Sequence, residues 1–218
     1  MLPIMDVSRW QGSIDWDKVR ASGLVSGVML RALGNSSKDA PGKPYIDPYF
    51  ARNYRECQRL GIPCGVYYYC KAVNTAEADA ELAMLRKVLT GKTLQLPVAV
   101  DIEDKYVQTP LDKQTLTDIA AHALGTVERW GFYAMLYTGL YFGETKLYMG
   151  GAALRKYDVW VAAYRDAKPT PAWSFGMWQY TRKGKIPGVS KGVDLSHAYK
   201  DYAAIIAKKG LDRLREGA

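Results

Sequence analysis

The sequence has little of what metal centres and disulfide frameworks are built from. Its 218 residues include only three Cys and two His. Cys57, Cys64 and Cys70 form no CxxC pair and have no paired His near them, so we expect three buried free thiols, as in a protein folded in a reducing compartment. The sequence therefore predicts no metal site and no bound cofactor.

An export signal and long apolar runs are also missing. The first ten residues, MLPIMDVSRW, lack a basic leading region, and their apolar run is interrupted at Asp6. No later stretch approaches the length of a membrane span. We expect a protein without a membrane span that is made in the cytoplasm and needs another factor to reach any target outside the cell.

Phe is scarce as well, and amphipathic rings take its place. Sixteen Tyr and six Trp stand against four Phe, and the net charge is +8. Rings with a polar edge suit a groove that is both wet and adhesive, and excess positive charge attracts polyanions. The basic residues are scattered, apart from a group at the C-terminal end (Lys208, Lys209, Arg213 and Arg215), and no nucleic-acid motif surrounds them. We therefore expect a solvated helix face there and no nucleic-acid partner.

The stretch 96–104, LPVAVDIED, carries the most chemistry. Residues 98–102 form a β-branched run typical of a buried strand, and Asp101 and Glu103 stand two positions apart. Alternate side chains of a strand share a face, so the two carboxyl groups are expected roughly 6–7 Å apart, a distance suited to attack on a glycosidic bond. The plainer alternative is a strand end at which acids simply meet water.

Strand and helix patterns alternate along the chain. Helical segments follow each of the first five predicted strands, whereas the last three strands have little helix between them, and 34–44 reads as a long surface loop. The predicted strands cover residues 2–5, 25–32, 63–70, 98–102, 132–138, 158–163, 174–180 and 192–195. Eight mostly parallel strands predict an α/β fold closed into a TIM-like barrel. We expect one catalytic domain over residues 1–209 and a basic tail over 210–218.

The helix boundaries are predicted from capping residues. Asp15 is expected to cap the first helix, Asp47 followed by Pro48 the second, Asn74 the third, and Asp112 or Thr115 the fourth. Active sites of such barrels lie where the carboxyl ends of the strands meet. Four acids, Asp6, Asp101, Glu103 and Asp194, are therefore expected to converge at one mouth.

Six segments, in this order, resemble glycoside hydrolase family 25, the muramidase-type lysozymes of phage endolysins and bacteria. They are DVSRWQGSIDW at 6–16, DIE at 101–103, YTG at 137–139, WVAAY at 160–164, WQYT at 178–181 and PGVSKGVDLS at 187–196. The resemblance covers residues 1–207, nearly the whole chain. It implies a (β/α)5β3 barrel and hydrolysis of the β-1,4 bond between N-acetylmuramic acid and N-acetylglucosamine in peptidoglycan.

The resemblance also implies residue roles. Glu103 matches the general acid/base of the family, and crowding by other carboxyl groups would raise its pKa. Asp101 either stabilises positive charge at the sugar C1 or orients the 2-acetamido group as an internal nucleophile, and the sequence leaves both roles open. Asp6 and Asp194 are expected to tune Glu103 and to bind sugar.

Aromatic residues at positions that match the family's groove are expected to bind the substrate. They are Tyr67, Tyr69, Tyr137, Trp160, Tyr164, Trp178 and Tyr180. Gln179 alternates with two of them and should face the opposite way. The expected partner is bacterial peptidoglycan, reached after release through a holin-type or other non-classical route, with anionic wall polymers as a further partner.

Two other readings remain. A metal-dependent phosphodiester hydrolase on a similar barrel would use the same acids around Mg²⁺, although only His122 and His197 are available as imidazole ligands. A wall-binding protein without turnover would keep the groove, although the presence of all four acids disfavours it.

Overall fold

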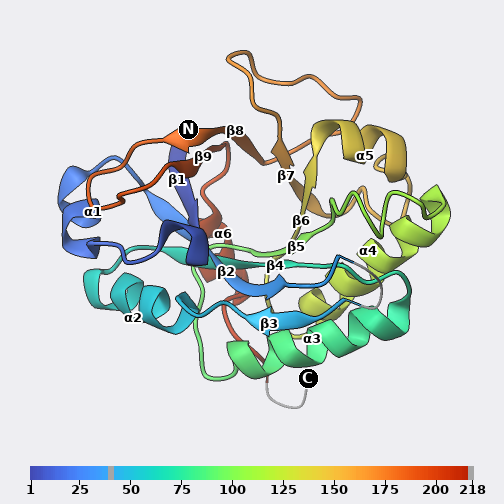
Figure 1. Cartoon of the computed structure of the whole chain (residues 1–218), viewed down its shortest axis with the longest axis horizontal. Coiled ribbons are helices and arrows are strands. Elements are labelled where there is room, and N and C mark those ends of the chain that lie inside the picture. The colour runs from blue at the N-terminus through green and yellow to red at the C-terminus, as the bar shows by residue number, and fades with distance from the viewer. Residues whose placement is uncertain (39–41, 216–218) are drawn as a thin grey trace.

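The computed structural model describes residues 1–38 and 42–215, and its centre is a closed barrel of eight strands (Figure 1). The strands are β1 (Leu2–Val7), β2 (Gly27–Asn35), β3 (Pro44–Ile46), β4 (Cys64–Tyr69), β5 (Val98–Asp101), β6 (Ala134–Gly139), β7 (Asp158–Ala162), β8 (Met177–Gly184) and β9 (Val193–Ala198). Pairing is parallel from β1 through β2, β4, β5, β6 and β7 to β8. β9 runs antiparallel between β8 and β1 and closes the ring, while β3 lies outside it. The predicted barrel of eight mostly parallel strands is confirmed.

The helices lie around the barrel. They are α1 (Trp16–Ser22), α2 (Phe50–Leu60), α3 (Thr75–Leu89), α4 (Lys113–Arg129), α5 (Leu140–Lys146) and α6 (Tyr202–Lys209). Asp15, Asn74 and Asp112 accept backbone N–H bonds at the starts of α1, α3 and α4, as predicted. The predicted cap of α2 is wrong: Tyr49 occupies the N-cap without a side-chain bond. Asp47 is buried two residues earlier, where its carboxylate pairs with the guanidinium of Arg31 at 2.6 Å and accepts from Tyr49 N–H at 3.0 Å in the turn before the helix.

The second strand and the loop after it differ from expectation. β2 continues to Asn35 and turns back through β3, which pairs antiparallel with it, so part of the loop predicted at 34–44 is a hairpin. Gly34 lets the Tyr45 side chain lie across β2, because a Cβ at position 34 would collide with the ring and hydroxyl of Tyr45. Residues 39–41 of the predicted loop lie outside the described residues.

The pleat of the strands sorts side chains into two cores. The inner core fills the barrel with residues such as Ile4, Met29, Ala99 and Trp160, while their strand neighbours pack outward against the helices. Tyr202 and Ile206 of α6 belong to the inner core, so α6 closes one end of the barrel. The opposite end is left to polar side chains.

The segment after α6 is held by backbone bonds. The carbonyls of Leu211 and Asp212 accept bonds from Tyr133 N–H at 3.1 Å and Leu94 N–H at 2.8 Å, and Arg215 N–H donates to Trp130 at 2.8 Å. Of the basic tail predicted at 210–218, residues 216–218 lie outside the described residues.

The three cysteines are free and buried, as expected. Among the described residues, none of the helices has the length and apolar character needed to span a bilayer.

Candidate active site

Four carboxyl groups line one cavity of about 400 Å³ at the open end of the barrel. Asp6 lies near the end of β1, Asp101 ends β5, and Glu103 follows two residues later. Asp194 reaches the same end from the start of the antiparallel strand β9, where it is the register partner of Asp6. Acids from three strands and one loop are thus brought together, as the barrel geometry predicts.

Glu103 reaches the cavity from a loop. We predicted that the strand continues through Ile102 and aligns the two acids by its pleat, but β5 ends at Asp101. The Ile102 carbonyl accepts a bond from Thr138 Oγ1 at 2.8 Å instead of continuing the ladder. Glu103 is consequently only partly buried, whereas Asp101 is 4% exposed.

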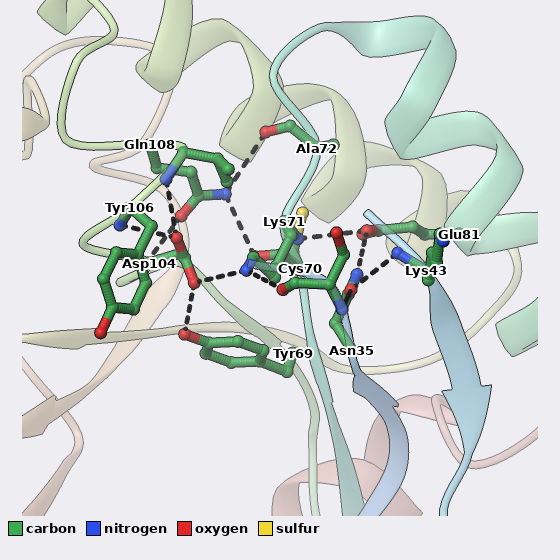
Figure 2. Close-up of polar contacts among 12 residues, drawn as sticks. Asn35, Lys43, Tyr69, Cys70, Lys71, Ala72, Glu81, Asp104, Tyr106 and Gln108 are labelled. Carbon is green, nitrogen blue, oxygen red and sulfur yellow. Dashed lines mark hydrogen bonds and ion pairs between the residues drawn. The ribbon is translucent and has the colours of Figure 1, made fainter. Parts of the chain in front are cut away.

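The loop that carries Glu103 is anchored by its neighbour Asp104 (Figure 2). The Asp104 carboxylate accepts bonds from the backbone N–H groups of Tyr106 and Val107, both at 2.8 Å, and from the Tyr69 hydroxyl at 2.9 Å. Lys71 Nζ lies 3.1 Å from the same carboxylate, and both side chains are 3% exposed. Burial opposes ionisation of Asp104, but these bonds outweigh it and hold its pKa below the ordinary value.

Gln108 adds a second brace to this loop. Its Oε1 accepts from Asp104 N–H at 3.0 Å, while its Nε2 donates to the Cys70 carbonyl at 3.1 Å and the Ala72 carbonyl at 3.4 Å (Figure 2). The loops after β4 and β5 are therefore joined directly behind Glu103.

Gln179 links the other side of the cavity to the acids. Its Oε1 accepts hydrogen bonds from Tyr137 at 2.9 Å and Tyr164 at 3.0 Å, and its Nε2 donates to Asp6 Oδ2 at 3.0 Å. With both phenols donating to the amide oxygen, the amide N–H₂ is directed at Asp6. This amide lowers the pKa of Asp6, against a larger opposing effect of burial.

Burial raises the pKa of all four acids, and repulsion from other carboxyl groups adds to this effect at Asp6, Asp101 and Glu103. Burial, followed by Asp194 and Asp104, raises the pKa of Glu103 to about 7. Burial and then Glu103 raise the pKa of Asp101, while burial and then Asp194 raise the pKa of Asp6. Burial also raises the pKa of Asp194, opposed by a hydrogen bond from Asp6. The set consequently retains protons at a pH where isolated carboxyl groups have lost them.

Five of the seven rings expected in the groove line this cavity: Tyr67, Tyr69, Tyr137, Trp160 and Tyr164. Trp160 packs edge-on against Tyr137, with centroids 4.7 Å apart, and its indole N–H donates to Ser196 at 3.0 Å. Trp178 and Tyr180 do not line it. They alternate with Gln179 along β8, so when Gln179 faces the acids these two rings face outward, where they pack on the outer core and line a neighbouring hollow.

Six residues outside the predicted set also line the cavity: Arg9, Trp10, Arg31, Asn35, Tyr45 and Gln179. Gln179 could have been predicted to face the cavity from its alternation with Trp178 and Tyr180 along β8. The positions of the other five residues depend on the short 3₁₀ helix Arg9–Gln11 and on the β2–β3 hairpin, which only the folded chain reveals.

A larger hollow of about 640 Å³ lies beside α4 and α5, but Glu144 is its only acid, so it lacks the paired carboxyl groups of the acid cavity. Across residues 1–38 and 42–215, no group of three or more His, Cys, Asp or Glu side chains has a metal-binding arrangement.

Comparison with known proteins identifies the architecture. The model of the family "Glycosyl hydrolases family 25" matches residues 5–189. The chain belongs to this family. Its barrel is thus a glycoside hydrolase domain of the lysozyme kind, and the matched range includes Asp6, Asp101 and Glu103.

Relatives of this family 25 domain include named lysozymes. Lysozyme M1 of Streptomyces globisporus is 27% identical over 218 residues, covering 93% of this chain and 69% of its own length. The solved lysozyme of Streptomyces coelicolor is 26% identical, with a TM-score of 0.75, covering 96% of this chain and 97% of its own. The autolysin LytC of Streptococcus pneumoniae, solved with a synthetic peptidoglycan ligand, is 29% identical with a TM-score of 0.76. The match covers 89% of this chain but only 46% of LytC, so this chain spans less than half of that modular protein.

Proposed function

We propose that this family 25 domain is an N-acetylmuramidase that cleaves the β-1,4 bond between N-acetylmuramic acid and N-acetylglucosamine in bacterial peptidoglycan. The observation that carries the proposal is Glu103, a partly open carboxyl group among three other acids, with a pKa raised to about 7. We assign catalysis to the barrel of residues 1–209. Residues 210–218 carry two arginines and two acids, so the net charge of +8 that draws the protein to anionic wall polymers comes from the rest of the chain.

Glu103 acts as the general acid and then as the general base. With its pKa near the working pH, it holds the proton that the leaving glycosidic oxygen needs, and can afterwards take a proton from water. The Asp104 anchor restricts the loop on which Glu103 sits, so the carboxyl group is oriented before the substrate arrives.

Asp101 assists at the sugar ring. Its side chain lines the same cavity as Glu103. A carboxyl group in this position suits both roles open to Asp101, stabilising charge at C1 or accepting the N–H of the 2-acetamido group. A glycan without N-acetyl groups distinguishes these two roles. Its cleavage should be lost if the acetamido group is the nucleophile and should persist if Asp101 stabilises charge at C1.

The first test is the loss of activity on replacing Glu103. Glu103→Gln keeps the shape of the side chain but cannot donate the proton, so clearing of purified bacterial walls should slow by about 10²- to 10⁴-fold. The matched control is Glu128→Gln, which removes an exposed carboxylate paired with Lys156 and should clear walls at the wild-type rate.

Product analysis then fixes the bond. Released muropeptides should carry N-acetylmuramic acid at their reducing ends, whereas N-acetylglucosamine ends would indicate a glucosaminidase and free peptides an amidase. Clearing that stops with EDTA would favour the metal-dependent phosphodiester hydrolase, and wall binding without clearing would favour a non-catalytic role.

A further inference from the structure

A second hollow, of about 670 Å³, adjoins the acid cavity. The two share Tyr164, whose ring is 52% exposed and whose hydroxyl donates to Gln179. The hollow lies where the connection after β7, which extends beyond the barrel in Figure 1, meets the outer face of β8. Only the Tyr164 side chain therefore separates this hollow from a substrate bound in the acid cavity beside Glu103.

The hollow carries excess positive charge. Arg165, Arg182 and Lys183 line it, against one carboxylate, Asp166. In the parts of the chain that the structure describes, these three cations form no ion pair. Arg182 instead lies over the Tyr164 ring, with Cζ 5.6 Å from the centroid. Its guanidinium donors remain free for an anion.

An aromatic surface lies beneath these cations. Tyr180 and His197 stack with centroids 4.3 Å apart and an interplanar angle of 11°, and Trp178 packs against both. The indole N–H of Trp178 donates to the Ala163 carbonyl at 2.8 Å. Burial lowers the pKa of His197, so its ring is neutral near pH 7. Free cations above apolar rings suit a carboxylate carried on an amide or alkyl chain.

We propose that this hollow binds the carboxylates of the lactyl-peptide arm of muramic acid, and so makes the enzyme prefer muramic acid glycan over a neutral N-acetylglucosamine polymer. The proposal rests on the muramidase function given above, because that substrate presents such an arm beside the scissile bond. The arm offers two sources of carboxylate. One is the peptide stem of intact glycan, and the other is the lactyl group itself, which is free only after the stem is removed.

The test measures binding, so that it does not depend on turnover. Glu103→Gln serves as the background, and Arg165→Gln with Lys183→Gln is added to it. Neither cation appears among the charges that shift the pKa values of the four acids, whereas Arg182 acts on Asp194. Arg86→Gln, an exposed arginine on α3, is the matched control. Calorimetry gives Kd for three soluble glycans: one with peptide stems, one stripped of stems, and a neutral chitooligosaccharide.

We expect the added pair of substitutions to raise Kd about fivefold or more for a muramic acid glycan and to leave the chitooligosaccharide unchanged. A loss confined to the stem-bearing glycan assigns the contact to the peptide carboxylates, and a loss confined to the stripped glycan assigns it to the lactyl group. An unchanged Kd for both muramic acid glycans, or an equal loss for the neutral glycan, overturns the proposal. Absence of wall cleavage by the wild type would instead overturn the muramidase function while leaving this binding result interpretable.

Discussion

Four carboxyl groups line one cavity, and the ionisation of one makes ionisation of its neighbours less favourable. Glu103 is partly buried, and its pKa is raised to about 7. Asp194 is the largest contribution to this value after burial. The neighbouring acids thereby determine the pH range over which Glu103 is protonated.

The pH dependence of cleavage should report this coupling. Catalysis that needs protonated Glu103 should fall about tenfold per pH unit above about 7. Asp194→Asn removes a negative charge that raises the pKa of Glu103, so the alkaline limb of kcat against pH should move to lower pH. An alkaline limb at the same pH in both proteins would contradict the role of Asp194.

The same residue should affect stability in a defined direction. The pKa of Glu103 is about 7 in the folded protein against 4.5 ordinarily, so the folded state binds the proton more tightly between these values. The free energy of unfolding should therefore decrease as pH rises from about 4.5 to about 7. Glu103→Gln should remove this component and be more stable than the wild type at pH 8 by about 1–3 kcal/mol, a range that allows for the partial exposure of Glu103. Denaturant unfolding at pH 5 and pH 8 measures this difference in the free energy of unfolding, with Glu128→Gln as the control. If the free energy of unfolding changes equally with pH in the wild type and in Glu103→Gln, the argument is wrong.

Single residues were predictable from the sequence where strand ends and side-chain alternation decide their position. Asp101 ends β5, Asp6 is the penultimate residue of β1, and Tyr67, Tyr69 and Tyr137 share the inward face of their strands. Trp178 and Tyr180 were wrongly expected in the groove, because they alternate with Gln179 and therefore face outward. Arg31 and Tyr45 were missed because their place depends on a hairpin that the loop-like composition of 34–44 concealed.

At the scale of elements, the loop after β5 depends on a buried ion pair. Lys71→Met should leave the Asp104 carboxylate buried without its cation and lower the free energy of unfolding by about 3–5 kcal/mol. The rate of wall clearing should fall as well, because Asp104 adjoins Glu103. Lys71→Met with Asp104→Asn removes both charges and should recover part of the stability. Lys87→Met, an exposed lysine on α3, is the control, and equal stability of the two single variants would contradict the anchoring role.

Helix boundaries were mostly predictable because their causes are local. Asp15, Asn74 and Asp112 each cap a helix within three residues of their own position. The predicted cap of α2 was placed too early: the Asp47 carboxylate accepts from Tyr49 N–H at 3.0 Å, in the turn before the helix, as well as from Arg31. β3 was unpredictable because a three-residue strand exists only through its neighbour in the sheet.

At the scale of the whole molecule, the count of alternating elements was enough to predict a closed barrel of eight strands, but not the direction of the strand that closes it. The direction of β9 is set by pairing with β8 and β1, which composition does not encode. This direction explains why Asp194 reaches the acid cavity from the beginning of its strand.

The net charge of +8 should govern attraction to the wall. Exposed charges are screened over about 8 Å at physiological ionic strength, so clearing of walls that carry anionic polymers should slow as salt rises from about 0.05 to 0.5 M. Cleavage of a short soluble muramic acid glycan should change much less. Equal salt dependence for the two substrates would show that long-range attraction is unimportant.

The hydrogen bond from Gln179 to Asp6 joins residues 173 positions apart in the chain. A chain emerging from the ribosome therefore exposes Asp6 early and completes its surroundings only when the last two strands have been made and have joined the first. A partial translation product that ends before β8 lacks both Gln179 and Asp194, so the set of four acids is complete only in chains that include the last two strands of the barrel.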